Sequence, residues 1–228
     1  MSAKICVSIL PTNNQQALAL IEEAEQAGAD FIEVRMDRLE ESRNLKELPK
    51  STKVPLIATN KLQVERGFFS GTETERLQTL LAAAKSGFQY VDVDMLGPKS
   101  SEAIAKLKEA NVKLIVSYHK FDGVLSPSAL EHILDKEIAS GADVCKIVLT
   151  ANQIDDNLPV LTFVSFASTK AKLVCFCMGE AGRISRLLSP AFGAYFTFAS
   201  LDGGSETAQG QISIAEMRSA YKILGIKQ

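Results

Sequence analysis

Lys146 is the residue whose setting most strongly suggests chemistry, because it lies inside residues 142–149 (ADVCKIVL), a segment that otherwise resembles a buried strand. Burying an ammonium among apolar residues is costly unless the charge is paired or used. Desolvation is expected to lower the pKa of a lysine, and a lysine that is neutral near pH 7 attacks carbonyl carbons. Taken alone, Lys146 fits a Schiff-base nucleophile and a structural lysine, ion-paired or reaching solvent at the strand end, about equally well.

Three charged side chains alternate in residues 31–37 (FIEVRMD), where Glu33, Arg35 and Asp37 fall on one face of a strand. If the apolar residues between them pack against helices, this charged face points to the other side. Packing alone explains three such charges poorly, although a structural salt-bridge cluster remains an alternative. We favour a polar cradle for a polyhydroxylated substrate.

His119 ends the apolar run 113–119, next in order to the run that carries Lys146. A lone histidine at such a place often caps or fills a core, but a histidine beside a Schiff-base lysine can move protons. The second histidine, His132, lies mid-helix, and we assign it a surface or packing role. The pair His119 and Lys146 therefore favours carbonyl chemistry.

Glycines and arginines follow the run 173–177, in residues 178–186 (MGEAGRISR). Glycine lets the backbone approach a ligand, and a helix that begins there favours anions. Arg186 can offer a planar fork to a carboxylate. The polar, glycine-rich residues 201–211 predict a flexible lid, or alternatively the phosphate site common in barrels.

The elements that must position these residues are eight apolar, strand-like runs alternating with helical segments. The runs are 5–9, 31–36, 55–59, 90–94, 113–119, 144–149, 173–177 and 195–199; the helical segments include 15–27, 73–86, 101–110, 127–140, 182–188 and 212–224, with a short polar helix within 40–48. This pattern predicts an α/β fold, a (β/α)8 TIM barrel in which residues 1–228 form a single catalytic domain. A doubly wound open sheet is less favoured, because no glycine-rich turn follows the first run. In a barrel, the charged strand ends meet at the active site.

Composition narrows the class of function. The net charge of -2 and pI of about 5.8 give no electrostatic support for binding nucleic acid or a membrane surface. No apolar run approaches the roughly 20 residues of a membrane span, and no signal peptide is recognised, so we expect a cytoplasmic protein. The 2 histidines argue against a His-rich metal site, and the 4 cysteines lack C-x-x-C spacing and are expected to be buried thiols.

Taken in order, these motifs resemble those of type I 3-dehydroquinate dehydratase, over residues 5–212. Residues 33–37 (EVRMD) resemble the family's E-x-R-x-D motif, and residues 117–119 (SYH) resemble its histidine motif. Residues 142–147 (ADVCKI) resemble its Schiff-base strand, and residues 178–186 resemble its M-G-x-x-G-x-x-S-R motif. Residues 196–198 (FTF) and 208–211 (AQGQ) resemble its T-F and A-P-G-Q segments. The resemblance implies dehydration of 3-dehydroquinate to 3-dehydroshikimate in the shikimate pathway, which leads to chorismate and the aromatic amino acids.

The resemblance also implies roles for individual residues. Lys146 would form the Schiff base, His119 would donate and accept protons, and Glu65 would orient His119. The residues implied in substrate binding are Ser8, Glu33, Arg35, Lys61, Met178, Arg186, Phe198, Thr207 and Gln211. Because the covalent lysine supplies the electron sink, neither a metal nor a cofactor is expected. The family is often dimeric, so a homodimer is an expectation from the resemblance alone.

Several positions depart from the family pattern. The motif T-x-R-x-x-x-E-G-G is present as residues 59–67 (TNKLQVERG), with Lys61 in place of an arginine, and the two are not equivalent in forked contacts. Asp94 replaces a common glutamate, and Lys120 a common aspartate. The lid motif is residues 207–211 (TAQGQ), in a loop about two residues longer, and loss of its proline predicts a less rigid lid.

Two other functions compete with this interpretation. A Schiff-base aldolase barrel would also use a lysine on the sixth strand, with a phosphate site at Gly203 and Gly204, but it leaves the charged face around Glu33 unexplained. A non-catalytic barrel, or a module of a longer bifunctional enzyme, is the other alternative. The presence of both Lys146 and His119 argues against a decayed site.

Overall fold

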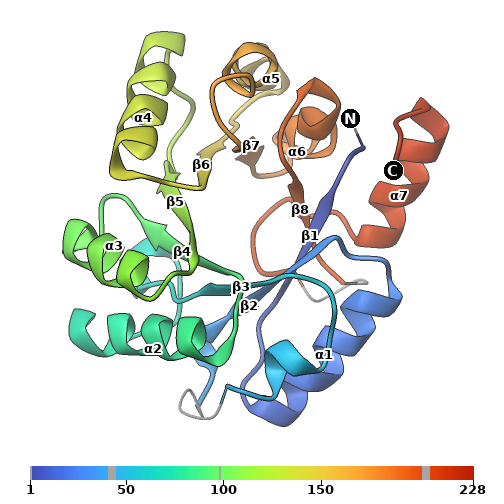
Figure 1. The fold of residues 1–228 in the computed structure, drawn as a ribbon. Coiled ribbons are helices and arrows are strands. Elements are labelled where there is room, and N and C mark those ends of the chain that lie inside the picture. The colour runs from blue at the N-terminus through green and yellow to red at the C-terminus, as the bar shows by residue number, and fades with distance from the viewer. Residues whose placement is uncertain (1, 41–44, 98, 202–205) are drawn as a thin grey trace.

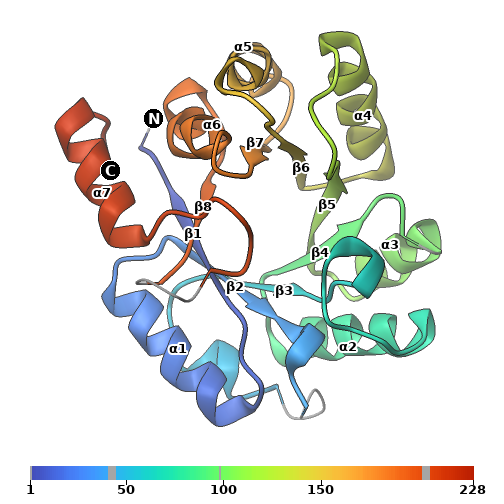
Figure 2. The ribbon, with the colours of Figure 1, turned by 180° about the vertical axis from the view of Figure 1, so that it is seen from behind.

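The protein forms a ring of parallel strands surrounded by helices, as the two opposite views in Figure 1 and Figure 2 show. The structure, a computed structural model, describes residues 2–40, 45–97, 99–201 and 206–228. The strands are β1 (Ile5–Ile9), β2 (Phe31–Arg35), β3 (Leu56–Thr59), β4 (Tyr90–Asp94), β5 (Lys113–His119), β6 (Val144–Thr150), β7 (Leu173–Met178) and β8 (Thr197–Ala199). The α-helices are α1 (Asn14–Gln26), α2 (Glu73–Ser86), α3 (Ser100–Glu109), α4 (Pro127–Ser140), α5 (Asn157–Ala167), α6 (Arg183–Leu188) and α7 (Ile214–Leu224).

The eight strands form one sheet in the order β7-β6-β5-β4-β3-β2-β1-β8, and every paired neighbour is parallel. The two edges meet where the Tyr195 N–H, just before β8, donates to the Leu173 carbonyl at 2.7 Å. The barrel is thus nearly closed. This confirms the predicted (β/α)8 barrel and rejects the open doubly wound sheet.

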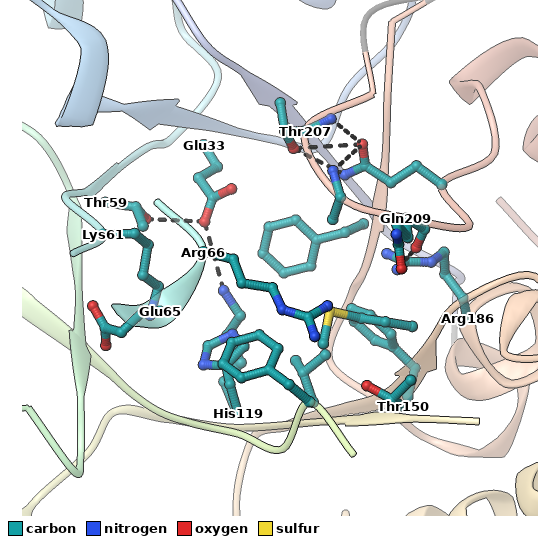
Figure 3. A pocket seen from close by; sticks show the side chains of 18 of the residues that line it. Glu33, Thr59, Lys61, Glu65, Arg66, His119, Thr150, Arg186, Thr207 and Gln209 are labelled. Atoms are coloured by element: carbon teal, nitrogen blue, oxygen red, sulfur yellow. Dashed lines mark hydrogen bonds and ion pairs between the residues drawn. The ribbon is translucent and has the colours of Figure 1, made fainter. Parts of the chain in front are cut away.

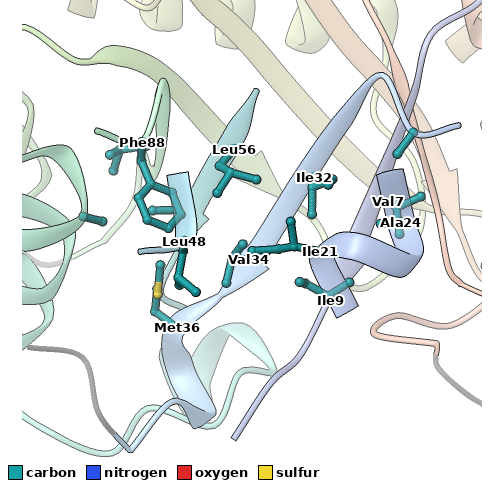
Figure 4. Packing of buried hydrophobic residues seen from close by; sticks show 14 of the residues in the cluster. Val7, Ile9, Ile21, Ala24, Ile32, Val34, Met36, Leu48, Leu56 and Phe88 are labelled. Atoms are coloured by element: carbon teal, nitrogen blue, oxygen red, sulfur yellow. The ribbon is translucent and has the colours of Figure 1, made fainter. Parts of the chain in front are cut away.

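Strand residues alternate between two environments. Outward-facing Ile32, Val34 and Met36 pack with residues of the surrounding helices, among them Ile21 and Ala24 of α1 (Figure 4). Inward-facing apolar residues form a separate cluster that fills the barrel: Cys6, Phe31, Ile57, Tyr90, Ile115, Val144, Val148, Val174, Phe176, Phe196 and Phe198. The charged residues of β2 therefore share the inner face, as the sequence predicted.

The predicted elements differ from the observed ones mainly at their ends, by one or two residues. One α-helix, α5, was not among the predicted segments, because its sequence (NLPVLTFVSFA) is apolar almost throughout and lacks clear helical periodicity. Between β2 and β3 the described residues contain two single 3-10 turns, Met36–Arg38 and Leu48–Lys50, and no α-helix. Of the predicted short helix within 40–48, residues 41–44 lie outside the described residues, and the described residues 45–48 are not α-helical.

All four cysteines are buried and free, as predicted: Cys6, Cys145, Cys175 and Cys177. In the described part of the chain, no helix has the length and apolar character needed to cross a membrane.

Candidate active site

A pocket of about 260 Å³ lies at the C-terminal end of the barrel (Figure 3). The predicted site residues that line it are Glu33, Arg35, Lys61, Glu65, His119, Lys146, Met178, Arg186, Phe198, Thr207 and Gln211. Ser8 does not line the pocket, but its hydroxyl donates to the Glu33 carboxylate at 2.5 Å. The barrel thus gathers residues from distant parts of the chain, because parallel strands end at the same rim.

Lys146 projects from β6 into the pocket and is only 5% exposed. Its Nζ lies 2.8 Å from Asp92 Oδ2, 3.5 Å from Glu33 Oε1 and 4.4 Å from the centre of the Phe198 ring. Burial alone would lower the pKa of Lys146, but the Asp92 and Glu33 carboxylates outweigh burial and raise it. The expectation of a lowered lysine pKa is therefore wrong for the free protein, because two carboxylates from other strands accompany the amine.

Asp92, on β4, is the shared carboxylate partner of the two pocket lysines, Lys146 and Lys61, and has no role assigned from the sequence. One oxygen accepts from Lys146, and the other accepts from Ser117 Oγ at 2.7 Å and lies 3.4 Å from Lys61 Nζ. Burial alone would raise the pKa of Asp92, but the two lysines hold it well below its usual range. Asp92 is consequently a permanent anion shared by two ammonium groups. The alternating sequence VDVD of residues 91–94 was the available signal.

Lys61, which replaces the family arginine, points its amine at protein acceptors. Its Nζ lies 3.2 Å from Ser117 Oγ and 3.8 Å from Asp94 Oδ2, besides the Asp92 contact. It lines the pocket, yet its donors are engaged by these side chains. Its role in substrate binding stays a prediction.

His119 ends β5 with its Nδ1 3.4 Å from Asp94 Oδ2. Burial and the positive charge of Lys61 lower the pKa of His119 to about 4, although Asp94 opposes the shift. The imidazole is therefore neutral at pH 7 and can accept a proton. Its ring lies nearly parallel to that of Phe121, with 6.2 Å between the ring centres.

Glu65 lies beside Asp94 and not directly against His119. One of its oxygens accepts the Leu62 N–H at 2.9 Å. Burial and the neighbouring Asp94 raise the pKa of Glu65, with Lys61 opposing. The carboxylate that contacts the imidazole is that of Asp94, so the predicted orienting role of Glu65 stays a prediction that would act through Asp94.

Glu33 and Arg35 are both held by neighbouring side chains. Glu33 accepts from Ser8 and from Thr59 Oγ1 at 2.9 Å, the latter a partner that was not predicted. Arg35 makes a forked pair with Asp37 through its Nε and Nη2, each at 2.7 Å. The charged face of β2 thus supplies one carboxylate toward Lys146 and one neutralised guanidinium.

Arg186 presents the opposite situation. Its side chain is buried and stacks 4.4 Å from the centre of the Phe176 ring, but its Nε has no hydrogen-bond partner among the described residues. Among the described residues, its side chain makes one hydrogen bond, a long one of 3.4 Å from Nη2 to the Gln209 carbonyl. Burial lowers the pKa of Arg186 to about 9, so it remains a cation at pH 7. A buried cation with no anionic partner among the described residues suits an anionic ligand.

The segments after β7 and β8 approach each other closely above Arg186. The Gly179 N–H donates to the Gln209 carbonyl at 3.2 Å, and a Cβ at Gly210 would lie 2.2 Å from the Gly179 carbonyl oxygen. Gln211 Oε1 accepts the Thr207 N–H at 2.7 Å. Residues 202–205 of the predicted lid, which include Gly203 and Gly204 of the alternative phosphate site, lie outside the described residues.

Together, the fold and pocket define a (β/α)8-barrel enzyme with a buried lysine in its site. The chain belongs to the type I 3-dehydroquinase family, whose model matches residues 5–228. It is 36% identical to the 3-dehydroquinate dehydratase of Desulfotalea psychrophila over 223 residues, 96% of this chain and 97% of that protein.

Solved structures show the same likeness. The 3-dehydroquinate dehydratase of Geobacillus kaustophilus superposes with a TM-score of 0.87 at 25% identity, covering 99% of this chain and 92% of that one. The type I enzyme of Clostridium difficile, determined with covalent modified comenic acid, gives 0.87 at 26% identity, covering 98% and 92%. These relatives confirm the predicted family and favour a dehydratase over an aldolase barrel.

Proposed function

We propose that the pocket dehydrates 3-dehydroquinate to 3-dehydroshikimate, a step of the shikimate pathway, through a Schiff base on Lys146. The observation that carries the proposal is the amine of Lys146, buried in the pocket between the carboxylates of Asp92 and Glu33. Membership of the type I 3-dehydroquinase family supports 3-dehydroquinate as the substrate. Neutral His119 and Arg186, which has no ion pair among the described residues, complete the groups that the reaction needs.

The first half of the reaction forms the iminium. Lys146 loses a proton, its nitrogen attacks the C3 ketone carbon, and the ketone oxygen takes up a proton to give a carbinolamine. Loss of the C3 hydroxyl as water leaves a protonated imine. Because the imine is cationic, the carboxylates that raise the pKa of Lys146 also stabilise this electron sink.

The second half eliminates water. The iminium acidifies the C2 proton, which His119 removes, and the electron pair forms an enamine. Collapse of the enamine forms the double bond between C1 and C2 and expels the C1 hydroxyl, which takes the proton from His119 and leaves as water. Hydrolysis of the imine then releases the product and restores Lys146. His119 thus serves as base and acid in turn.

Substrate binding divides among the remaining groups. Arg186 offers its unpaired donors to the substrate carboxylate, with Gln211 assisting from the lid segment. Met178 and Phe198 form apolar walls for the ring, and Glu33 accepts from substrate hydroxyls. We also propose that residues 1–228 act as one catalytic domain, located in the cytoplasm and paired as a homodimer, with no cofactor and no metal.

The direct test is to trap the imine. The folded protein is incubated with 3-dehydroquinate and borohydride, which delivers hydride to the imine carbon, and the adduct is located by intact mass and peptide mapping. One adduct on Lys146, absent from Lys146→Arg, is the expected result. An adduct on Lys61, the other pocket lysine, would contradict the assignment of the nucleophile. No adduct with 3-dehydroquinate, together with trapping of a phosphorylated sugar, would instead support the aldolase alternative.

A further inference from the structure

The loop between β3 and α2 places a second unpaired guanidinium at the pocket. Arg66 follows the 3-10 turn Gln63–Glu65 with φ 60°, a left-handed conformation found at only three non-glycine residues of the described chain. The turn is tightly held: the Gly67 N–H donates to the Leu62 carbonyl at 2.9 Å, and a Cβ at Gly67 would lie 2.1 Å from the Lys61 carbonyl oxygen. The backbone at position 66 therefore suits glycine, and a larger residue is disfavoured there.

The side chain of Arg66 nevertheless has a defined position. Its guanidinium lies 4.5 Å from the centre of the Phe121 ring, which in turn lies nearly parallel to His119. Figure 3 shows the side chain extending across the pocket, of which it is a lining residue. A strained residue at a binding site indicates that its side chain serves a purpose there.

The other cations of the pocket differ from Arg66 in their ion pairs. Arg35, Lys61 and Lys146 each have a carboxylate partner. Arg66, like Arg186, has no ion pair with any residue that the structure describes, so its donors remain available. In the motif of residues 59–67, this chain has lost the arginine at 61 and has an arginine at 66 instead of a glycine.

We propose that Arg66 is a substrate-binding residue, which donates from the pocket mouth to oxygen atoms of the bound hydroxy acid while stacked on Phe121. This inference rests on the proposed function and adds a residue to it. Lys61 cannot replace a forked donor, because an ammonium has no planar fork and its amine already faces Asp92, Asp94 and Ser117. Arg66 provides one that is oriented by an aromatic face and exposed enough to meet incoming substrate.

Arg66→Gly and Arg66→Ala test the proposal by steady-state kinetics with 3-dehydroquinate. Glycine adopts the left-handed conformation freely, so Arg66→Gly should melt at or above the wild-type temperature. Both variants should raise KM about tenfold, as expected for loss of a charged hydrogen bond at an exposed site, with kcat within about twofold. Arg66→Lys should recover part of the loss, because it restores charge but not the fork.

Arg38→Ala is the matched control. Arg38 is also exposed and stacks on an aromatic ring, with 4.9 Å to the centre of Phe68, but it does not line the pocket. It should keep the wild-type KM. The inference would be overturned if Arg66→Gly kept the wild-type KM, or if Arg38→Ala raised KM by the same factor as Arg66→Gly. Failure of the wild-type protein to turn over or trap 3-dehydroquinate would overturn the proposed function itself, so the two failures are distinguishable.

Discussion

The pocket has two sides that treat buried charge in opposite ways. On the side built by β2 to β6, the cations Lys61 and Lys146 are paired with carboxylates, chiefly Asp92. On the side built by β7, β8 and their loops, Arg186 is buried on Phe176 without a carboxylate in the described chain. The paired side carries Lys146 and His119, the groups suited to catalysis. On the unpaired side, a bound ligand can supply the anion that Arg186 lacks.

This difference separates two uses of electrostatic energy. Paired charges hold an amine and a cationic imine in place throughout a reaction, because their partners are already oriented. An unpaired buried guanidinium is costly until an anion arrives, so binding relieves that cost and draws the ligand to one orientation. Substitutions of the buried cations on the two sides should therefore affect different kinetic constants.

The largest effect is expected from Lys146→Met. Without the amine no imine forms, and we expect kcat/KM to fall by about 10⁴-fold or more, in line with loss of a nucleophile in other enzymes. Because Arg186 is untouched, the Kd for 3-dehydroquinate measured by calorimetry should change by less than about tenfold. Lys170→Met, at an exposed lysine far from the pocket, serves as the control and should keep full activity.

If a folded Lys146→Met variant loses both binding of 3-dehydroquinate and turnover, the contrast between the two sides is wrong. The main contribution to substrate affinity would then come from the side that carries Lys146.

Arg186→Met should give the converse result. Removing the only unpaired buried guanidinium in the described pocket should raise KM about 100-fold, the magnitude of a charged hydrogen bond lost at a buried site. Borohydride trapping on Lys146 at saturating substrate should survive. Arg186→Lys should fall between the two, because an ammonium lacks the fork. A fall in kcat at unchanged KM would show that Arg186 acts on the transition state and not on binding.

The paired side was the harder one to predict from the sequence. The barrel followed from eight alternating runs. Lys146 stood out as a charge inside an apolar run, His119 as a histidine at the end of one, and Arg186 as an arginine in the glycine-containing segment after another. Asp92 was missed, because its importance arises only when β4, β5 and β6 bring residues 92, 117 and 146 together. The direction of the Lys146 pKa shift was wrong for the same reason: burial is readable from an apolar run, but partners 54 and more residues away are not.

Asp92→Asn tests whether that shared anion defines the paired side. Removing its charge leaves burial to act on Lys146 with Glu33 as the main group opposing it, so the pKa of Lys146 should fall. The pH dependence of trapping should then shift to lower pH, while kcat should drop about tenfold as the cationic imine loses a counterion. Folding stability should fall by about 3 kcal/mol, because two buried ammonium groups lose a partner.

Ser117→Ala is the control for Asp92→Asn, since it removes a hydrogen bond to Asp92 but keeps the charge. Its trapping profile should stay close to that of the wild type. An unshifted profile in Asp92→Asn would show that Glu33 alone sets the charge of the lysine.

The smallest effect is expected from Lys61→Met. It tests whether Lys61 acts on the charge of His119 or on substrate binding. His119 must be neutral to act as a base, and its pKa of about 4 means that kcat/KM should fall as pH drops through about 4. Lys61 is one cause of that low pKa, so Lys61→Met should raise the pKa of His119 and move the acid limb to higher pH. Burial remains in the variant, so the shift should stay below about one pH unit. Lys61→Arg keeps the charge and should leave the limb in place. If Lys61→Met instead raises KM with the limb unmoved, then Lys61 works with Arg186 in holding the substrate, and the boundary between the two sides lies closer to His119.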